Sequence, residues 1–176
     1  MDIVADSSTL ILLAKVTLLK TFAEEKKLII TPMVKLEVFR KKEQEDAQII
    51  STLLREALIL QSERKAKFQK FVSDFNIGVG ESEALAFAWN EKKILATDDW
   101  RAIKACKILG VKFITAIHCL LYLVEKGKLD KKMAVAKLKN LEKCGRYNSD
   151  IIKDAKNIIT GCKKIESKIN ASFSGG

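Results

Sequence analysis

The chain has 176 residues, 48% of them hydrophobic, and a mean hydropathy of +0.01, which suits one globular domain with a core and argues against disorder. No apolar run reaches the roughly 18 residues of a membrane span, and no basic region opens the chain as in a signal peptide, so we expect a cytoplasmic protein. The net charge of +10 is uneven, because residues 1–99 carry 15 Lys+Arg and 16 Asp+Glu whereas residues 100–176 carry 17 and 6.

Short apolar runs alternate with amphipathic stretches in the first half of the chain. In chain order we expect a strand at 2–5, helices at 10–14 and 18–25, a strand at 28–30, a helix that begins at Pro32, a helix at 43–56 and an edge strand at 57–60. Ser7, Ser8 and Thr9 are expected to supply the N-cap oxygens of the first helix. Thr31 is expected to cap the helix that begins at Pro32, since proline suits the first helical position.

The same alternation continues to the C-terminus. We expect helices at 64–75 and 81–92, a strand at 94–96, a helix at 100–109, a strand at 111–115, and helices at 116–125, 131–143 and 149–159. This order predicts an α/β domain in which helices cover both faces of a central parallel sheet, with further C-terminal helices. The domain is expected to span residues 1–160, followed by a flexible tail at 161–176.

Acidic residues follow two of the predicted strands. Asp6 comes directly after Ile3-Val4-Ala5, and Asp98 and Asp99 follow the strand at 94–96. Open α/β sheets bind ligands in the crevice at the carboxyl ends of their strands, so both places favour a functional role. The alternative for Asp6 is a cap or turn. Capping explains one of the two adjacent aspartates, but not obviously both, since neighbouring carboxylates repel.

Three glutamates lie near the starts of predicted helices: Glu37, Glu81 and Glu83. The last two follow Gly78-Val79-Gly80, a predicted flexible turn that permits close backbone approach. The helix macrodipole offers an alternative reason for Glu81 and Glu83, and Glu37 alone suits a surface ion pair with Lys41.

Six such acids repel one another unless a cation lies among them. Hard divalent ions such as Mg²⁺ and Mn²⁺ prefer carboxylate oxygens. The sequence therefore predicts a metal-dependent phosphoryl-transfer enzyme with metal ligands drawn from Asp6, Glu37, Glu81, Glu83, Asp98 and Asp99. The basic C-terminal part would supply a surface for phosphate groups, although solvated lysine faces explain that charge equally well.

Histidine, cysteine and tryptophan side chains are expected to be structural. The single histidine, His118, lies in an apolar helix, and the four cysteines form no C-x-x-C pair, so a zinc site is not expected. The cysteines are interpreted as free thiols. Trp89 and Trp100 flank the strand at 94–96 and are expected to pack rather than to stack on bases.

The acidic residues resemble the quartet of PIN-domain proteins. The resemblance lies in Val-Ala-Asp-Ser-Ser-Thr-Leu-Ile around Asp6, Thr-Pro-Met-Val-Lys-Leu before Glu37, Gly-Glu-Ser-Glu-Ala-Leu-Ala-Phe-Ala around Glu83, and Thr97-Asp98-Asp99. It covers roughly residues 1–125 and is greatest to the prokaryotic branch related to VapC toxins, within it to a mostly archaeal group.

The resemblance implies a small three-layer α/β/α domain that cleaves single-stranded or structured RNA with Mg²⁺ or Mn²⁺. It implies catalysis by Asp6, Glu37, Glu83 and Asp99, in which Glu83 stands where the family has a shorter aspartate, and it implies a homodimer and a toxin with an antitoxin partner. The residues expected to contact substrate are Ser7, Thr97, Lys15, Arg101 and Lys104. The alternatives are a non-catalytic PIN-fold module that binds RNA or protein, and a metal-dependent phosphatase.

Overall fold

The computed structural model describes residues 2–40, 43–63 and 66–161. Its centre is a parallel five-stranded sheet in the order β3-β2-β1-β4-β5. The strands are β1 Ile3–Ala5, β2 Leu28–Ile30, β3 Ile59–Gln61, β4 Ile94–Ala96 and β5 Phe113–Ile114. The predicted α/β fold with a central parallel sheet is confirmed.

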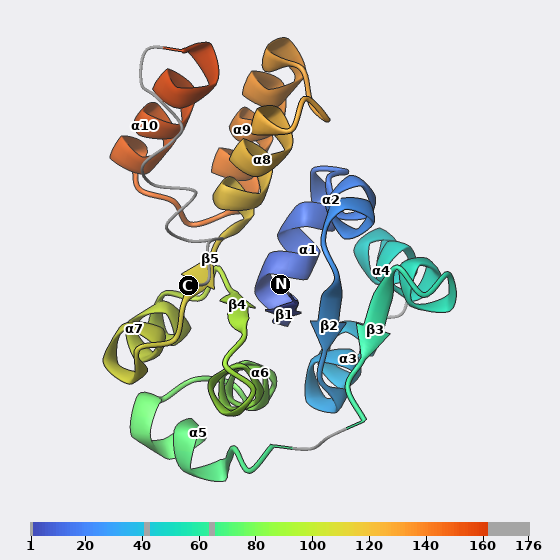
Figure 1. Ribbon diagram of the computed structural model, residues 1–176, viewed down its shortest axis with the longest axis vertical. Coiled ribbons are helices and arrows are strands. Elements are labelled where there is room, and N and C mark those ends of the chain that lie inside the picture. The colour runs from blue at the N-terminus through green and yellow to red at the C-terminus, as the bar shows by residue number, and fades with distance from the viewer. Residues whose placement is uncertain (1, 41–42, 64–65, 162–176) are drawn as a thin grey trace.

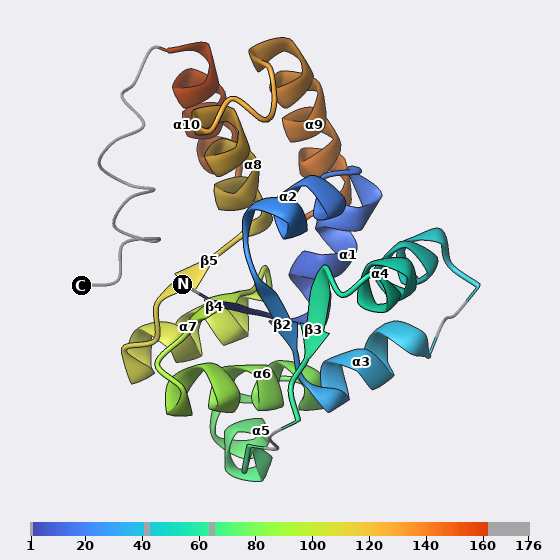
Figure 2. The same ribbon diagram turned by 45° about the vertical axis from the view of Figure 1, so that its right-hand side comes forward.

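Ten helices lie within the described ranges. They are α1 Ser7–Lys15, α2 Leu19–Glu25, α3 Pro32–Phe39, α4 Glu45–Arg55, α5 Gln69–Phe75, α6 Val79–Asn90, α7 Trp100–Leu109, α8 Ala116–Glu125, α9 Lys131–Cys144 and α10 Ser149–Thr160. Figures 1 and 2 show α3 and α6 on one side of the strands and α1 on the other. Helix α5 begins later than expected, at Gln69, and the predicted start at residues 64–65 lies outside the described residues.

The order of the strands in the sheet determines where a ligand site is expected. All residues of β1 and β4 are buried, and the two strands pair in register from Ile3 with Ile94 to Ala5 with Ala96. The chain runs from β1 outward to β2 and β3, then returns to the other side of β1 as β4. The direction of winding therefore reverses between β1 and β4, and at such a point the carboxyl ends of the strands open a crevice.

Three C-terminal helices pack against one another above the sheet in the view of Figure 1. Helix α8 is apolar and largely buried, and it also contacts α1 and α2. The predicted hairpin of α8 and α9 is therefore present, with α10 as a third member. Whether residues 1–160 form one domain stays a prediction, and residues 162–176 of the predicted tail lie outside the described residues.

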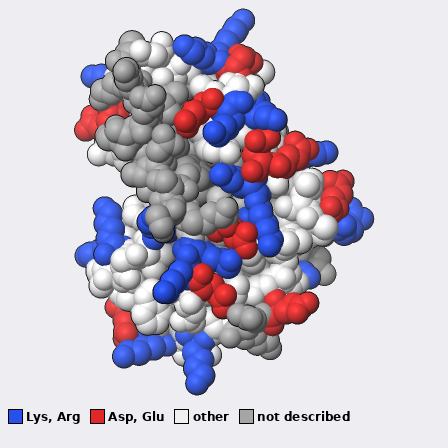
Figure 3. Space-filling view, viewed as in Figure 1, with Lys and Arg blue, Asp and Glu red and all other residues white. Residues whose placement is uncertain are grey.

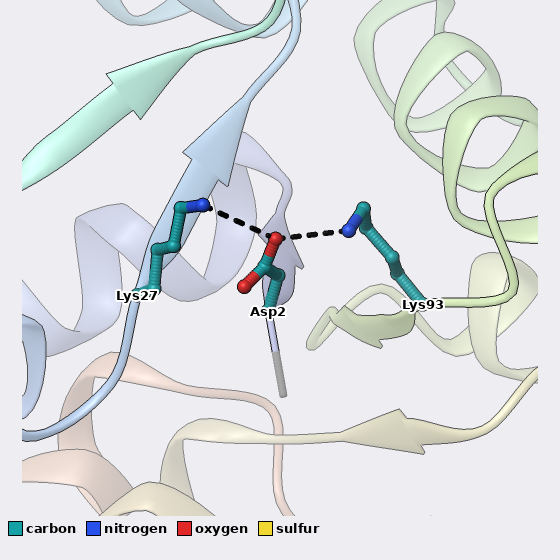
Figure 4. A network of polar contacts seen from close by, with 3 residues as sticks. All are labelled: Asp2, Lys27 and Lys93. Atoms are coloured by element: carbon teal, nitrogen blue, oxygen red, sulfur yellow. Dashed lines mark hydrogen bonds and ion pairs between the residues drawn. The ribbon is translucent and has the colours of Figure 1, made fainter.

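An ion-pair cluster ties the amino ends of three strands together (Figure 4). Asp2 Oδ2 lies 2.9 Å from Lys93 Nζ and 3.4 Å from Lys27 Nζ, which precede β4 and β2. The hydrogen bond from Lys93 is the largest of the effects that lower the pKa of Asp2. These partly exposed pairs stabilise the fold by about 1 kcal/mol at most. They lie at the opposite edge of the sheet from Asp6 and have no part in the site.

No helix in the described ranges is both long and apolar enough to cross a bilayer. Cys106, Cys119 and Cys144 are free thiols, and Cys162 lies outside the described residues. His118 forms a capping box with Thr115 at the start of α8, and burial lowers its pKa, so its role is structural.

Candidate functional site

Asp6 is the most buried acid of the candidate site, with an exposed fraction of 0%. Its Oδ1 accepts hydrogen bonds from the Thr9 backbone N–H (3.0 Å) and Ser8 Oγ (2.7 Å), and its Oδ2 accepts one from Thr97 Oγ1 (2.5 Å). The expected capping by Ser7, Ser8 or Thr9 is wrong, because Asp6 itself caps α1. Burial raises the pKa of Asp6 from 3.8 to about 7, although three donors act in the opposite direction.

Glu37 reaches the same edge of the sheet from α3. Its Oε2 accepts a hydrogen bond from Ser7 Oγ (2.9 Å), and its Oε1 accepts one from the Gly80 backbone N–H (2.8 Å). Helix α6 begins at Val79, so Gly80 lies in the first helical turn and not in the predicted flexible turn. There its N–H has no partner within the helix and is free to donate to a carboxylate. A Cβ at Gly80 would overlap the carboxylate of Glu37, so the close approach requires glycine.

Glu81 and Asp99 complete a group of four acids at this edge of the sheet. Burial raises the pKa of Glu81, and the charges of Glu37 and Asp99 raise it further. The charge of Glu81 in turn adds to the raised pKa of Asp6. We call Asp6, Glu37, Glu81 and Asp99 the acidic cluster. Its members come from the ends of β1 and β4 and from α3 and α6.

Asp99 caps helix α7. Its Oδ1 accepts hydrogen bonds from the backbone N–H groups of Arg101 and Ala102, both at 2.9 Å. Its Oδ2 has no hydrogen bond within the described ranges, so this oxygen is available to a ligand.

Glu83 is directed elsewhere, although the resemblance assigns it to the quartet. Its exposed fraction is 2%, and its Oε2 accepts a hydrogen bond from the Met33 backbone N–H (2.8 Å). Thr31 occupies the N-cap position of α3, as expected, but its hydroxyl makes no capping bond, and Glu83 satisfies the helix start instead. The electrostatics therefore group Glu81, and not Glu83, with the other three acids.

Asp98 is also directed away from the acidic cluster. Its Oδ2 accepts hydrogen bonds from Thr9 Oγ1 (2.6 Å) and the Ala116 backbone N–H (3.0 Å), and its Oδ1 accepts one from the Tyr147 hydroxyl. Asp98 thus accepts the first N–H of α8, whose N-cap is Thr115, while Asp99 caps α7, so both adjacent aspartates bind helix starts, contrary to our expectation. Both oxygens of Asp98 are engaged by these partners, and its role as a metal ligand stays a prediction.

The acidic cluster has the donor chemistry that a hard divalent cation requires. As the side chains stand, no group of three or more His, Cys, Asp or Glu residues in the described part of the chain is arranged to hold an ion. The residues nevertheless fit one, because Asp99 Oδ2 is unengaged and burial penalises the charges of Asp6 and Glu81. A cation offsets such a penalty. Asp6, Glu37, Glu81 and Asp99 are the residues that would hold it.

A family model described as DUF3368, PIN domain, matches residues 2–158. The chain belongs to this PIN-domain family. The resemblance recognised in the sequence is thereby confirmed. No curated protein matches. Among solved structures, the PIN domain is similar to a PilT N-terminus domain protein from the hyperthermophilic archaeon Sulfolobus solfataricus, with 20% identity over 68% of this chain and 90% of that one, and a TM-score of 0.44.

Two residues expected to contact substrate hold acids of the PIN domain in place, and the contact with substrate stays a prediction. Ser7 donates to Glu37, and Thr97, which is fully buried, donates to Asp6. The hydrogen bond from Thr97 opposes the effect of burial on the pKa of Asp6, because it favours the ionised carboxylate. The alternation of strand and helix shows that these residues lie near the strand ends, but not the direction of their hydroxyls.

The three basic residues expected to contact substrate lie in two different places. Arg101 and Lys104 follow Asp99 on α7 and line one cavity with the end of α5. Lys15 lies at the far end of α1, roughly 12 Å along the helix from Ser7 at 1.5 Å per residue, and lines a separate cavity. The structure therefore does not bring Lys15 to the acidic cluster.

Sequence reasoning missed Tyr147, which joins the C-terminal helices to the strand-end loop. It lies between α9 and α10 and donates its hydroxyl to Asp98. The Asp98 backbone N–H in turn donates to Ser8 Oγ, and Ser8 donates to Asp6. This chain of contacts links Tyr147 to the acidic cluster, although 49 residues separate it from Asp98.

Tyr147→Phe is expected to lower the free energy of unfolding by about 1–3 kcal/mol, because it removes one donor from a buried carboxylate. Urea denaturation at neutral pH measures the loss. The control is the same substitution in an Asp98→Asn background, where the carboxylate is absent and the loss should be smaller. Equal losses in both backgrounds would show that the hydroxyl acts independently of Asp98.

Proposed function

We propose that this PIN domain is a Mg²⁺- or Mn²⁺-dependent endoribonuclease that acts on single-stranded RNA. The observation that carries the proposal is the acidic cluster, in which carboxylates from the ends of β1 and β4 and from α3 and α6 converge. There burial, the charge of Glu37 and that of Asp99 raise the pKa of Glu81, and burial with the charge of Glu81 raises that of Asp6. A protein gains no stability from crowded buried charges, so their convergence favours a functional role.

A divalent ion in such a site supplies a Lewis acid that lowers the pKa of a bound water and neutralises charge on the phosphate. The chain itself supplies the orientation of the ligands. Ser7 and Gly80 fix the two oxygens of Glu37, and Thr97 and Ser8 fix those of Asp6. These bonds hold the carboxylates in place before a substrate arrives, which reduces the reorganisation needed during reaction. The expected products carry a 5′-phosphate and a 3′-hydroxyl.

The charge distribution of the chain supports a polyanionic substrate such as RNA. Residues 100–176 carry 17 Lys+Arg against 6 Asp+Glu, and two of these cations, Arg101 and Lys104, lie on α7, the helix that Asp99 caps. On the face shown in Figure 3, basic side chains are interspersed with acidic ones. Affinity for the RNA backbone therefore comes from local groups of cations such as this pair rather than from one continuous stripe on that face.

The test is cleavage of labelled, unstructured RNA by the purified protein in Mn²⁺, with EDTA in a parallel reaction. Cleavage should require the metal. Two matched variants decide which glutamate acts. Glu81→Gln should reduce the rate strongly, and Glu83→Gln should chiefly lower stability, because a neutral amide oxygen accepts a weaker hydrogen bond from Met33 than a carboxylate does. A larger rate loss in Glu83→Gln would restore the quartet that the resemblance implies, and cleavage in EDTA would exclude a metal mechanism.

A second candidate is a non-catalytic module that keeps the fold and binds RNA or protein. It is favoured by the absence, in the described ranges, of three potential ligands already arranged around one point. RNA binding without cleavage in Mn²⁺, unaffected by Glu81→Gln, would support it.

The proposal extends to partners. A toxin of this class would be a homodimer paired with an antitoxin. A hydrodynamic mass of one chain at micromolar concentration, or the lack of a small neighbouring gene for an inhibitor, would count against that extension.

A further inference from the structure

A cavity of about 350 Å³ lies between α5 and α7, beside the acidic cluster. Its walls come from the end of α5, including Phe75 and Asn76, and from α7, including Trp100, Arg101 and Lys104. Figure 1 shows α5 and α7 next to α6, the helix that carries Glu81. The volume is within the range of small-ligand sites. Its walls combine two aromatic rings with two cations.

Trp100 is placed to receive a ligand and not to fill the core. Its exposed fraction is 62%, and within the described residues it has no contact with another aromatic ring. Trp89, with an exposed fraction of 49%, differs because its ring packs edge-on against Phe71 at 5.9 Å. Trp100 therefore does not pack in the core. An exposed indole beside cations suits the flat face of a nucleobase.

The cations of the cavity complement a phosphate group next to that base. The Arg101 guanidinium lies 5.5 Å from the centre of the Trp100 ring and donates to the Asn76 backbone carbonyl (3.1 Å), which fixes its position. Lys104 follows one helical turn later on the same wall. The one acid that lines the cavity, Asp74, is outnumbered by the two cations, so a negatively charged ligand is favoured.

The cavity and the acidic cluster are formed by residues that are neighbours in the sequence. Asp99 is the cap of α7, and Trp100 and Arg101 are its first residues. On the opposite wall, Asn76 precedes Gly78, and the side chain of Glu81 lies against Gly78. If one nucleotide of an RNA strand lies in the cavity, the phosphate of the neighbouring nucleotide would therefore lie at the acidic cluster.

We propose that this cavity is a nucleobase subsite, in which one base of single-stranded RNA stacks on Trp100 while Arg101 and Lys104 face the adjoining phosphate. The inference rests on the proposed function, since it names how that site holds its substrate. It predicts that the domain prefers unpaired RNA, because a base within a duplex has no free face to offer the indole.

The test uses the fact that the chain has two tryptophans. In Trp89→Phe protein the fluorescence reports Trp100 alone, and in Trp100→Phe protein it reports Trp89 alone. Both are titrated in EDTA, to prevent cleavage, with an unstructured RNA oligonucleotide and with an abasic sugar–phosphate chain of the same length. RNA should quench the emission of Trp100 and not that of Trp89, and the abasic chain should quench neither.

Affinity gives a second readout in the same buffer. Trp100→Ala should weaken RNA binding about tenfold or more, since base–aromatic stacking is worth roughly that factor. Trp89→Ala, which also removes an exposed indole, should leave the affinity unchanged. Trp100 is exposed, so its substitution should not unfold the protein, and a melting curve verifies this.

Three results would overturn the subsite: unchanged Trp100 emission at saturating RNA, equal quenching by the abasic chain, or equal affinity in Trp100→Ala and Trp89→Ala. Quenching by an unrelated acidic peptide but not by RNA would identify a protein-binding surface instead. These results are separate from the nuclease proposal. Quenching without cleavage in Mn²⁺ would overturn the nuclease alone, and cleavage with unaltered Trp100 emission would overturn the subsite alone.

Discussion

Asp6→Asn is expected to remove RNA cleavage and, in the metal-free protein, to raise the free energy of unfolding at neutral pH. Loss of cleavage follows because the substitution removes a charged ligand from the acidic cluster. Groups that only orient metal ligands are worth about 10- to 100-fold, so loss of a ligand should cost at least about 100-fold. Initial cleavage rates in Mn²⁺ measure it, with Glu125→Gln, an exposed acid on α8, as the control.

The gain in stability follows from the raised pKa of Asp6, about 7 in the folded protein against 3.8 ordinarily. The folded state then binds the proton more tightly than the unfolded state. The contribution of Asp6 to the free energy of unfolding is greatest below about pH 4, falls as the pH rises to about 7, and is constant above that pH. A tenfold change in proton affinity is worth about 1.4 kcal/mol, so the fall is up to roughly 4 kcal/mol.

Urea denaturation in EDTA at pH 4.5 and pH 8 checks this expectation. Asp6→Asn should lose most of the difference in stability between the two pH values, whereas Glu125→Gln should keep it. Added Mn²⁺ should stabilise the wild-type protein and not Asp6→Asn, because an ion that binds only the folded state raises its stability. A wild-type protein more stable at pH 8 than at pH 4.5 would show that Asp6 is not held in a buried, unneutralised state.

Gly80→Ala is expected to reduce cleavage by about 10- to 100-fold without unfolding the protein. The added Cβ would lie 2.7 Å from Glu37 Oε1 and closer still to the other two carboxylate atoms. Glu37 must therefore move, and its bonds to Ser7 and Gly80 are lost or weakened. The expected loss of rate equals the loss typically caused by removing a group that orients a metal ligand. The helix itself should tolerate the change, since alanine favours helix over glycine by about 1 kcal/mol.

The control is the same change in a Glu37→Ala background, where no carboxylate remains to be displaced. Gly80→Ala should then have little further effect on the cleavage rate, and the two substitutions should be strongly non-additive. The melting temperature of Gly80→Ala, measured alongside, should stay close to that of the wild type. An equal rate loss in both backgrounds would mean that Gly80 acts through the backbone of α6 and not through Glu37.

The sequence by itself determined the fold class and the edge of the sheet at which the acids gather. Buried strands and amphipathic helices have different hydrophobic periods, so β1, β2 and β4 were predicted to within a residue. Asp6 and Asp99 follow such strands directly, and local spacing is sufficient to place them in the crevice. Lys15 was expected near that edge, but the helix runs from Ser7 to Lys15 and carries its side chain well away from it.

The tertiary structure decided which of two neighbouring acids joins the cluster. Asp98 and Asp99 are neighbours in the sequence, but only Asp98 accepts hydrogen bonds from Ala116 and Tyr147, which lie 18 and 49 residues further along the chain. Glu83 is likewise bound to Met33, 50 residues before it, which leaves Glu81 to face Glu37. Such choices depend on long-range partners that satisfy buried polar groups, and no local pattern records them. The exposure of Trp100 has the same origin, because it depends on where α5 packs relative to α7.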